Sequence, residues 1–263
     1  GRTYELIDEE IVNRYEKGSM GHEISTGKFY SVASSSRFAL SSFCKIQDGI
    51  IRKAERIGDV DISNLDFEVG LPITDVSEPQ MEVSLDANNA HYFIEAKCHE
   101  IFDTSAHRKI ELSVAYKDAL KKLLGIDIEN NWETISKTRT VWGKKKEGKI
   151  FGKGGNALTP IDFGLTMKTY HFDVKQFLCH LMGILSSEQY KAGQHINFFY
   201  LFYKDEEFSK IYEELEKEME IVAEKFMYVL EDQISFGCIY NTKFDTLESF
   251  SPYRIFNKKE LES

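Results

Sequence analysis

Apolar positions in the first half of the chain follow two different spacings. Residues 34–57 begin with three serines, which commonly cap helices, and continue with apolar residues at helical spacing. We therefore predict one long amphipathic helix over residues 34–57. Three strand-like runs follow at residues 66–74, 80–87 and 91–100, and turn-forming residues separate them.

A second helix and a long polar segment come next. Residues 111–124 have helical periodicity and stop at Gly125, a residue type that often terminates helices. Residues 126–170 are rich in lysine, glycine and other polar residues and show little periodicity. We expect this segment to be an insertion or a long loop.

The last third of the chain predicts a buried strand between two helices. Residues 173–186 start with an aspartate cap and carry an apolar stripe, and residues 196–203 are continuously apolar, as is typical of a central strand. Residues 206–233 suit a long acidic helix. A crossover through residues 173–186 would place 196–203 beside the third strand. The expected fold class is α/β, with a mixed central sheet, an inserted loop region and a long C-terminal helix.

Length and composition favour an ordinary folded protein. At 263 residues with 42% hydrophobic content, the chain can bury a large core, and we predict a single domain over residues 1–263. Its apolar runs are shorter than the roughly 18 to 20 residues of a membrane span, so no membrane association is expected. The four cysteines are widely spaced and contain no C-x-x-C pair, which favours a reducing cytoplasm over a zinc site or a disulfide framework.

Residues 80–98 can be folded into a tight hairpin with one apolar face. A two-residue turn at Asn88 and Asn89 pairs Ala87 with Ala90, because asparagine tolerates the positive φ that such a turn needs. Since side chains alternate along a strand, this register gathers the apolar residues on one side. The predicted core face consists of Met81, Val83, Leu85 and Ala87 on one strand and Tyr92, Ile94, Ala96 and Cys98 on the other.

The opposite face of this hairpin carries the candidate chemistry. The register places Glu82 directly opposite Glu95, and two carboxylates so close repel each other unless a proton or a cation lies between them. Mg²⁺ or Mn²⁺ would resolve the conflict, because such ions prefer oxygen ligands. Lys97 lies two residues further along the same face, where it can assist the attack of water on a phosphate. Asp86 is the rival ligand, although the register places it near His91.

These residues resemble the signature of the PD-(D/E)xK nucleases. FIEAK at 93–97 looks like the E-x-K half, and MEV at 81–83 supplies the preceding acid, with glutamate in place of the usual aspartate and without the proline. Over about residues 30–205, the chain also resembles a restriction-endonuclease-like group of bacterial proteins. Four further segments carry this resemblance: SSSRFALSSF, AYKDAL, KQFLCHLMGI and FFYLFYKD.

The resemblance implies an αβββαβ core, an insertion at about 126–170 and a C-terminal helical extension at about 205–263. It also implies that Glu82, Glu95 and the main-chain carbonyl of Ala96 bind Mg²⁺, and that Lys97 assists catalysis. Gln176 and His180 resemble a Q-x-x-x-Y element with histidine in place of tyrosine. Glu55, late in the first predicted helix, is a further candidate acid.

Charge is unevenly distributed along the chain. The formal net charge of −10 argues against non-specific coating of nucleic acid, yet residues 137–153 hold seven basic residues and one acid. This stretch is a candidate for binding DNA phosphates. The competing interpretation is that it is a plain exposed loop. Its candidate DNA-binding residues are Arg139, Lys144, Lys145 and Lys146, with Gln176 on the later helix. The acidic residues 205–232 suit either a solvated face or the seam of a homodimer.

The expected function is hydrolysis of DNA phosphodiester bonds by a cytoplasmic, magnesium-dependent bacterial nuclease. A catalytically silent member of the same fold, binding nucleic acid or a protein, is the alternative. A third hypothesis is an acidic scaffold that binds a partner through residues 205–232 without a metal.

Overall fold

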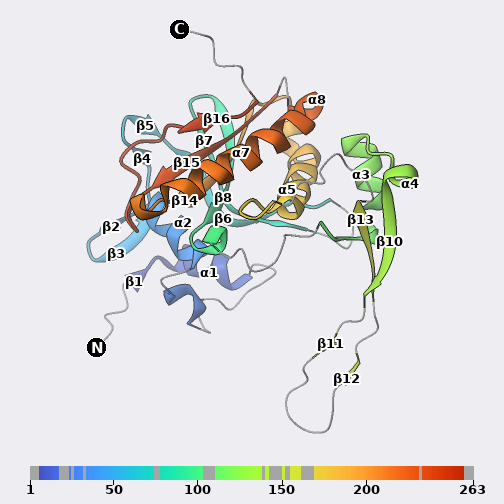
Figure 1. Ribbon diagram of the computed structural model, residues 1–263. Coiled ribbons are helices and arrows are strands. Elements are labelled where there is room, and N and C mark those ends of the chain that lie inside the picture. The colour runs from blue at the N-terminus through green and yellow to red at the C-terminus, as the bar shows by residue number, and fades with distance from the viewer. Residues whose placement is uncertain are drawn as a thin grey trace.

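The computed structural model describes residues 6–17, 24, 27–31, 34–73, 78–102, 110–137, 140–141, 150–151, 155–160, 169–230 and 233–257. Its centre is a six-stranded mixed sheet with the strand order β16-β15-β14-β8-β7-β6 (Figure 1). The neighbours β8, β14 and β15 run parallel, whereas the other pairs are antiparallel. The strands are β6 (Ser63–Gly70), β7 (Gln80–Ala87), β8 (Ala90–Lys97), β14 (Ile196–Tyr203), β15 (Ile234–Asn241) and β16 (Arg254–Ile255). The α/β class is thereby confirmed.

The β7–β8 hairpin has the predicted register. Asn88 and Asn89 form its turn with φ of 50° and 59°, and Ala87 pairs with Ala90. The predicted strand 80–87 is confirmed to the residue, while the third strand ends earlier than predicted, at Lys97. The first strand is shifted toward the N-terminus relative to the prediction 66–74.

The expected crossover is also present. Asp173 caps helix α5 (Val174–Ser186) by accepting a hydrogen bond from the Gln176 N–H. The chain then enters β14, which pairs in parallel with β8 from Ile196↔His91 to Phe202↔Lys97. All but the last residue of β14 are buried, as a strand covered on both faces requires.

Two apolar clusters cover the two faces of the sheet. One joins the sheet to α5 and to α7 (Ser209–Lys225), and the other joins it to α1 (Glu9–Lys17) and α2 (Ser35–Phe43). Five residues of the predicted hairpin core face lie in the α1–α2 cluster: Val83, Leu85, Ala87, Ile94 and Ala96. Met81 was wrongly assigned to that face, because it packs in the α5–α7 cluster with Phe93.

The long helix predicted over residues 34–57 is wrong. Helix α2 ends at Phe43, and the chain continues as β2 (Cys44–Gln47) and β3 (Ile50–Lys53), an antiparallel pair. Asp48 and Gly49 form the turn with φ of 52° and 76°, a conformation that Asp-Gly favours and that stops a helix. Three short strands complete this part of the chain: β1 (Leu6–Ile7), β4 (Arg56–Ile57) and β5 (Val60–Asp61).

The segment predicted as an insertion or long loop contains regular structure. After α3 (Lys117–Leu124), which ends at Gly125 as predicted, α4 (Ile128–Asn131) leads into β10 (Trp132–Lys137). Strand β10 pairs with β13 (Gly155–Pro160), which also pairs with β9 (Leu112–Ser113). Figure 1 shows β10 and β13 apart from the central sheet, with β11 (Thr140–Val141) and β12 (Ile150–Phe151) further out. Arg139, Lys144, Lys145 and Lys146 lie outside the described residues.

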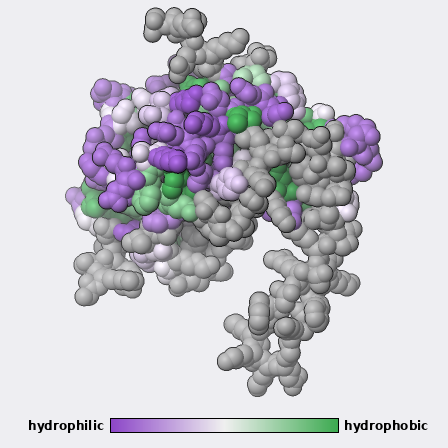
Figure 2. Space-filling view, in the orientation of Figure 1, coloured by the Kyte–Doolittle hydropathy of each residue, from purple (hydrophilic) through white to green (hydrophobic). Residues whose placement is uncertain are grey.

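The C-terminal part is less helical than predicted. Helix α7 is shorter than the predicted 206–233, a short helix α8 (Met227–Leu230) follows, and the chain then returns to the sheet as β15 and β16. Hydrophilic residues gather over α7 on the face shown in Figure 2. No described helix has the length and apolar character needed to cross a membrane.

Candidate functional site

The pairing of β7 with β8 stops just before the two predicted carboxylates. Both strands are described throughout, and their ladder ends at Val83↔Ile94, one step short of Glu82 and Glu95. Directly opposed Glu82 and Glu95 were predicted, but the structure leaves them beyond the ladder. Repulsion between two neighbouring carboxylates opposes close pairing there. The N-terminal turns of α2 and α5 reach the same end of the sheet, through Ser36 and Gln176.

Glu95 is almost completely buried, with 2% of its surface exposed. Its Oε1 atom accepts hydrogen bonds from Lys97 Nζ at 2.8 Å and from Gln176 Nε2 at 2.6 Å. Its Oε2 atom is buried and has no hydrogen-bond partner, although His180 Nε2 lies 3.8 Å away. Because a buried carboxylate oxygen without a donor is costly, this atom is a candidate to bind a ligand.

Glu82 is held between other acidic residues. Phe67↔Val83 and Val69↔Met81 are paired in the β6–β7 ladder, which sets Glu68 opposite Glu82. The Ser36 hydroxyl lies 3.4 Å from Glu68 Oε1 and 3.5 Å from Glu82 Oε1, and Glu82 Oε2 is buried without a partner.

These surroundings favour a protonated Glu82. Burial raises the pKa of Glu82 well above its ordinary value, and the neighbouring Glu68 and Glu95 raise it further, against the opposing effect of Lys97. Without a cation, a proton therefore stabilises this carboxyl group.

Lys97 is enclosed by acids. Burial alone would lower the pKa of Lys97, but Glu95, Glu100 and Glu82 outweigh burial and raise that pKa. Burial alone would likewise raise the pKa of Glu100, yet Lys97, the Ser35 hydroxyl and backbone N–H groups together lower it. Glu100 Oε2 accepts from the backbone N–H groups of Cys98 and His99 at 2.9 and 3.0 Å. Lys97 is thus a charged ammonium group in a fixed position.

Helix α5 supplies two polar side chains that face Glu95. Besides Gln176, the buried His180 donates from Nε2 to the Gln80 carbonyl at 3.1 Å, and its Nδ1 has no hydrogen-bond partner. Burial lowers the pKa of His180, against the raising effect of Glu95. The imidazole is therefore neutral near pH 7 and is a hydrogen-bonding group here, not a cation.

The rival ligand Asp86 lies at the other end of the hairpin. Its Oδ1 is 2.6 Å from His91 Nδ1, its Oδ2 accepts from Asn64 Nδ2 at 2.6 Å, and His91 Nε2 lies 3.0 Å from Ser84 Oγ. This partly buried chain of hydrogen bonds ties β6, β7 and β8 together near the β7–β8 turn. The structure therefore does not bring Asp86 to Glu95.

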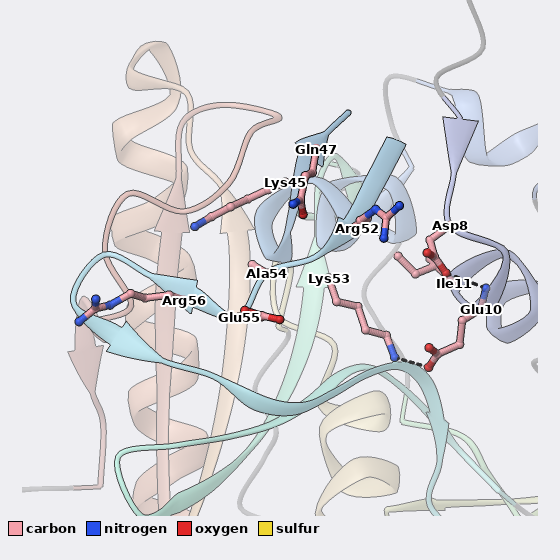
Figure 3. Close-up of a pocket in the computed structure, with 10 residues that line it drawn as sticks. All are labelled: Asp8, Glu10, Ile11, Lys45, Gln47, Arg52, Lys53, Ala54, Glu55 and Arg56. Carbon is pink, nitrogen blue, oxygen red and sulfur yellow. Dashed lines mark hydrogen bonds and ion pairs between the residues drawn. The ribbon is translucent and has the colours of Figure 1, made fainter. Parts of the chain in front are cut away.

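Glu55 is also separate from the candidate site. It follows β3 and not a helix, it is exposed, and it lines a hollow of about 480 Å³ beside α1. Figure 3 shows Lys45, Arg52 and Arg56 pointing in different directions around this hollow, while Lys53 reaches Glu10.

Ala96 packs on the α1–α2 face, whereas its neighbours Glu95 and Lys97 turn to the other side of β8. The role of its main-chain carbonyl stays a prediction.

The sequence alone does not identify Glu68 and Ser36 as site residues. The register of β6 against β7 could have pointed to Glu68, but it depends on the connection between the two strands, which has no turn signal as clear as Asn88-Asn89. Ser36 belongs to a serine run that was interpreted as a helix cap alone. Ser34 is the residue that actually caps α2, through the Arg37 N–H.

Comparison of the chain with protein-family models, with curated proteins and with solved structures gives no significant match. Within the described part of the chain, no three histidine, cysteine, aspartate or glutamate side chains are arranged so that they could hold a metal ion. Any cation at Glu82 and Glu95 would therefore rely on two side-chain carboxylates, with other oxygens completing its shell.

Proposed function

We propose that the protein is a metal-dependent nuclease of the PD-(D/E)xK type that hydrolyses DNA phosphodiester bonds. The observation that supports this best is the pair of buried, unpartnered oxygens on Glu82 and Glu95, next to the charged Lys97. The chain order α2, β6, β7, β8, α5, β14 also supports the proposal, because it follows the αβββαβ pattern expected of that superfamily. Strands β2 to β5 lie between α2 and β6, and β9 to β13 with α3 and α4 lie between β8 and α5.

The donor set suits Mg²⁺ or Mn²⁺. Mg²⁺ keeps several of its waters and commonly takes only one or two carboxylates together with a substrate phosphate. Glu82 and Glu95 offer two hard oxygen donors, and each has one oxygen that no protein group satisfies. Cysteine or histidine ligands, which softer metals favour, are not needed for this assignment.

Each side chain of the site has a definable task in the proposed reaction. A bound divalent cation would polarise the phosphoryl oxygen and lower the pKa of a water molecule. Because its pKa is raised, Lys97 stays protonated near pH 7, which favours donation to a phosphate oxygen or to the attacking water over proton abstraction. Gln176 orients Glu95 through its 2.6 Å hydrogen bond, and Glu82 completes the pair of carboxylates.

Cleavage of supercoiled, linear and single-stranded DNA with Mg²⁺ or Mn²⁺ tests the proposal. We expect Lys97→Met and Glu95→Gln to lower the cleavage rate by about 100-fold or more, as loss of one group that stabilises a transition state typically does. Lys53→Met is the matched control, because it removes a lysine from an ion pair of similar length, 2.7 Å to Glu10, outside the site. Absence of cleavage by the parent chain on all three substrates would refute the proposed activity.

A catalytically silent binding module is the second candidate, and one observation favours it. The Lys97–Glu95 ion pair at 2.8 Å, with a protonated Glu82, gives this cluster a stable arrangement in the absence of a cation. A silent module would show no rise in melting temperature with Mn²⁺, whereas a nuclease site should be stabilised by the ion that it binds.

A further inference from the structure

Glu68 lies where a third acidic group would complete the proposed metal centre. In the β6–β7 ladder it is opposite Glu82, close enough that its charge raises the pKa of Glu82. The Ser36 hydroxyl lies at nearly equal distances from both, 3.4 Å and 3.5 Å. The two strands and α2 therefore bring Glu68 into the same cluster as Glu82.

The backbone at Glu68 is unusual for its position. Glu68 has a φ of 49°, in the left-handed region that residues other than glycine rarely adopt. Its neighbours Phe67 and Val69 are regularly paired with β7, so the strand continues on both sides of it. Asn64, the other residue of β6 with a positive φ, lies instead at a shift of the strand register. Isolated residues with a strained backbone are found preferentially at functional sites.

The surroundings point to a ligand rather than to a structural ion pair. Glu95 is 2% exposed, yet its Oε2 has no hydrogen-bond partner, and the same is true of the buried Oε2 of Glu82. Glu82 thus lies near both Glu68 and Glu95, and Lys97 is the cation that Glu95, Glu100 and Glu82 share. A positive group brought in from solution would satisfy these oxygens, and a divalent cation with its water shell is the simplest such group.

We propose that Glu68 is a positioning residue of this centre, which accepts hydrogen bonds from the waters of a cation bound by Glu82 and Glu95. The assignment to the water shell, and not to the cation itself, follows from the absence of three directly converging ligands among the described side chains. Outer-shell groups of this kind orient the ligands and typically change metal affinity by about 10- to 100-fold. The inference rests on the proposed nuclease function, because it requires the same metal centre.

Calorimetric titration of the full chain with Mn²⁺ tests the inference, with the melting temperature measured in EDTA as a second readout. We expect Glu68→Gln to weaken Mn²⁺ binding by about 10- to 100-fold, and Glu95→Gln to abolish it. Glu68→Gly should also weaken binding, yet raise the melting temperature in EDTA, because glycine relieves the left-handed backbone and removes an acid beside Glu82. Asn89→Gly is the control, since Asn89 is exposed and has a similar backbone conformation, with a φ of 59°, in the β7–β8 turn outside the cluster.

The outcomes separate the inference from the function on which it rests. Unchanged Mn²⁺ affinity in Glu68→Gln, with binding by the parent chain intact, would overturn the role of Glu68 and leave the nuclease proposal standing. A lower melting temperature of Glu68→Gly in EDTA, with the melting temperature of Asn89→Gly raised, would show that Glu68 serves the fold and would also overturn the inference. If the parent chain binds no Mn²⁺, both proposals fail together.

Discussion

Replacing Glu82 with glutamine should stabilise the metal-free protein, and increasingly so as the pH rises. Burial and the nearby Glu68 and Glu95 raise the pKa of Glu82 well above its ordinary value of 4.5, so the folded protein keeps a proton that the unfolded chain releases. Above pH 4.5 the folded state therefore loses stability at this site until the pH passes the raised pKa. Glutamine has a similar shape and does not titrate, so the variant lacks this loss.

The size of the effect follows from proton linkage. One proton held only by the folded state changes the free energy of unfolding by about 1.4 kcal/mol per pH unit. The difference in the free energy of unfolding between Glu82→Gln and the parent should therefore grow by at most this amount per pH unit. The increase can be smaller because Glu68 shares in the titration. The effect has the opposite sign to that of a salt-bridged carboxylate, whose contribution is lost as the pH falls.

Urea unfolding in EDTA at several pH values between 5 and 8 measures this difference directly. Groups remote from this cluster titrate alike in both proteins, so the difference between the two curves reports Glu82 together with the acids coupled to it. With saturating Mn²⁺ the order should reverse, because only the parent keeps both carboxylates for the ion. Parallel pH profiles in EDTA would refute the reasoning, since they would mean that Glu82 titrates alike in the folded and unfolded states.

Three further changes test other parts of the structure. Gln176→Leu removes a 2.6 Å hydrogen bond to the buried Glu95 and should lower the free energy of unfolding by about 1–3 kcal/mol, measured by urea denaturation. Gly237→Ala should cost several kcal/mol in the same assay, because a Cβ atom there would lie 2.4 Å from the Arg254 carbonyl oxygen. Neutralising the lysines at 144–146 should weaken DNA binding and reduce its salt dependence in fluorescence anisotropy titrations, and an unchanged salt slope would exclude phosphate contacts there.

Sequence was most informative where structure depends on local signals. The β7–β8 register follows from the Asn88-Asn89 turn and from the alternation of apolar and polar residues on either side of it. The sequence therefore correctly places Glu82, Glu95 and Lys97 at one end of the hairpin. Helix α5 and strand β14 were likewise marked by an aspartate cap and an unbroken apolar run.

Prediction failed where one pattern fits two structures. The apolar spacing after Phe43 is compatible with a helix, and the Asp48-Gly49 turn, which decides in favour of β2 and β3, was outweighed by it. Strand β15 was missed because residues 205–263 were treated as one helical extension. Glu68 could not be placed, because its contact with Glu82 depends on how two whole strands are aligned.

Several costly features gather in one small part of this fold. Elsewhere in the described sheet, buried apolar residues pack on both faces, and the β6–β7 ladder shifts its register between Ser63 and Asp66. Around the end of β7, by contrast, two buried carboxylate oxygens lack partners, burial raises the pKa of Glu82, and Glu68 adopts a left-handed backbone. Each feature lowers stability: apolar residues of similar size would avoid the first two, and glycine would relieve the third. Local departures from stable packing that coincide in space are expected at functional sites. This coincidence makes the end of the β7–β8 hairpin the place to test for activity.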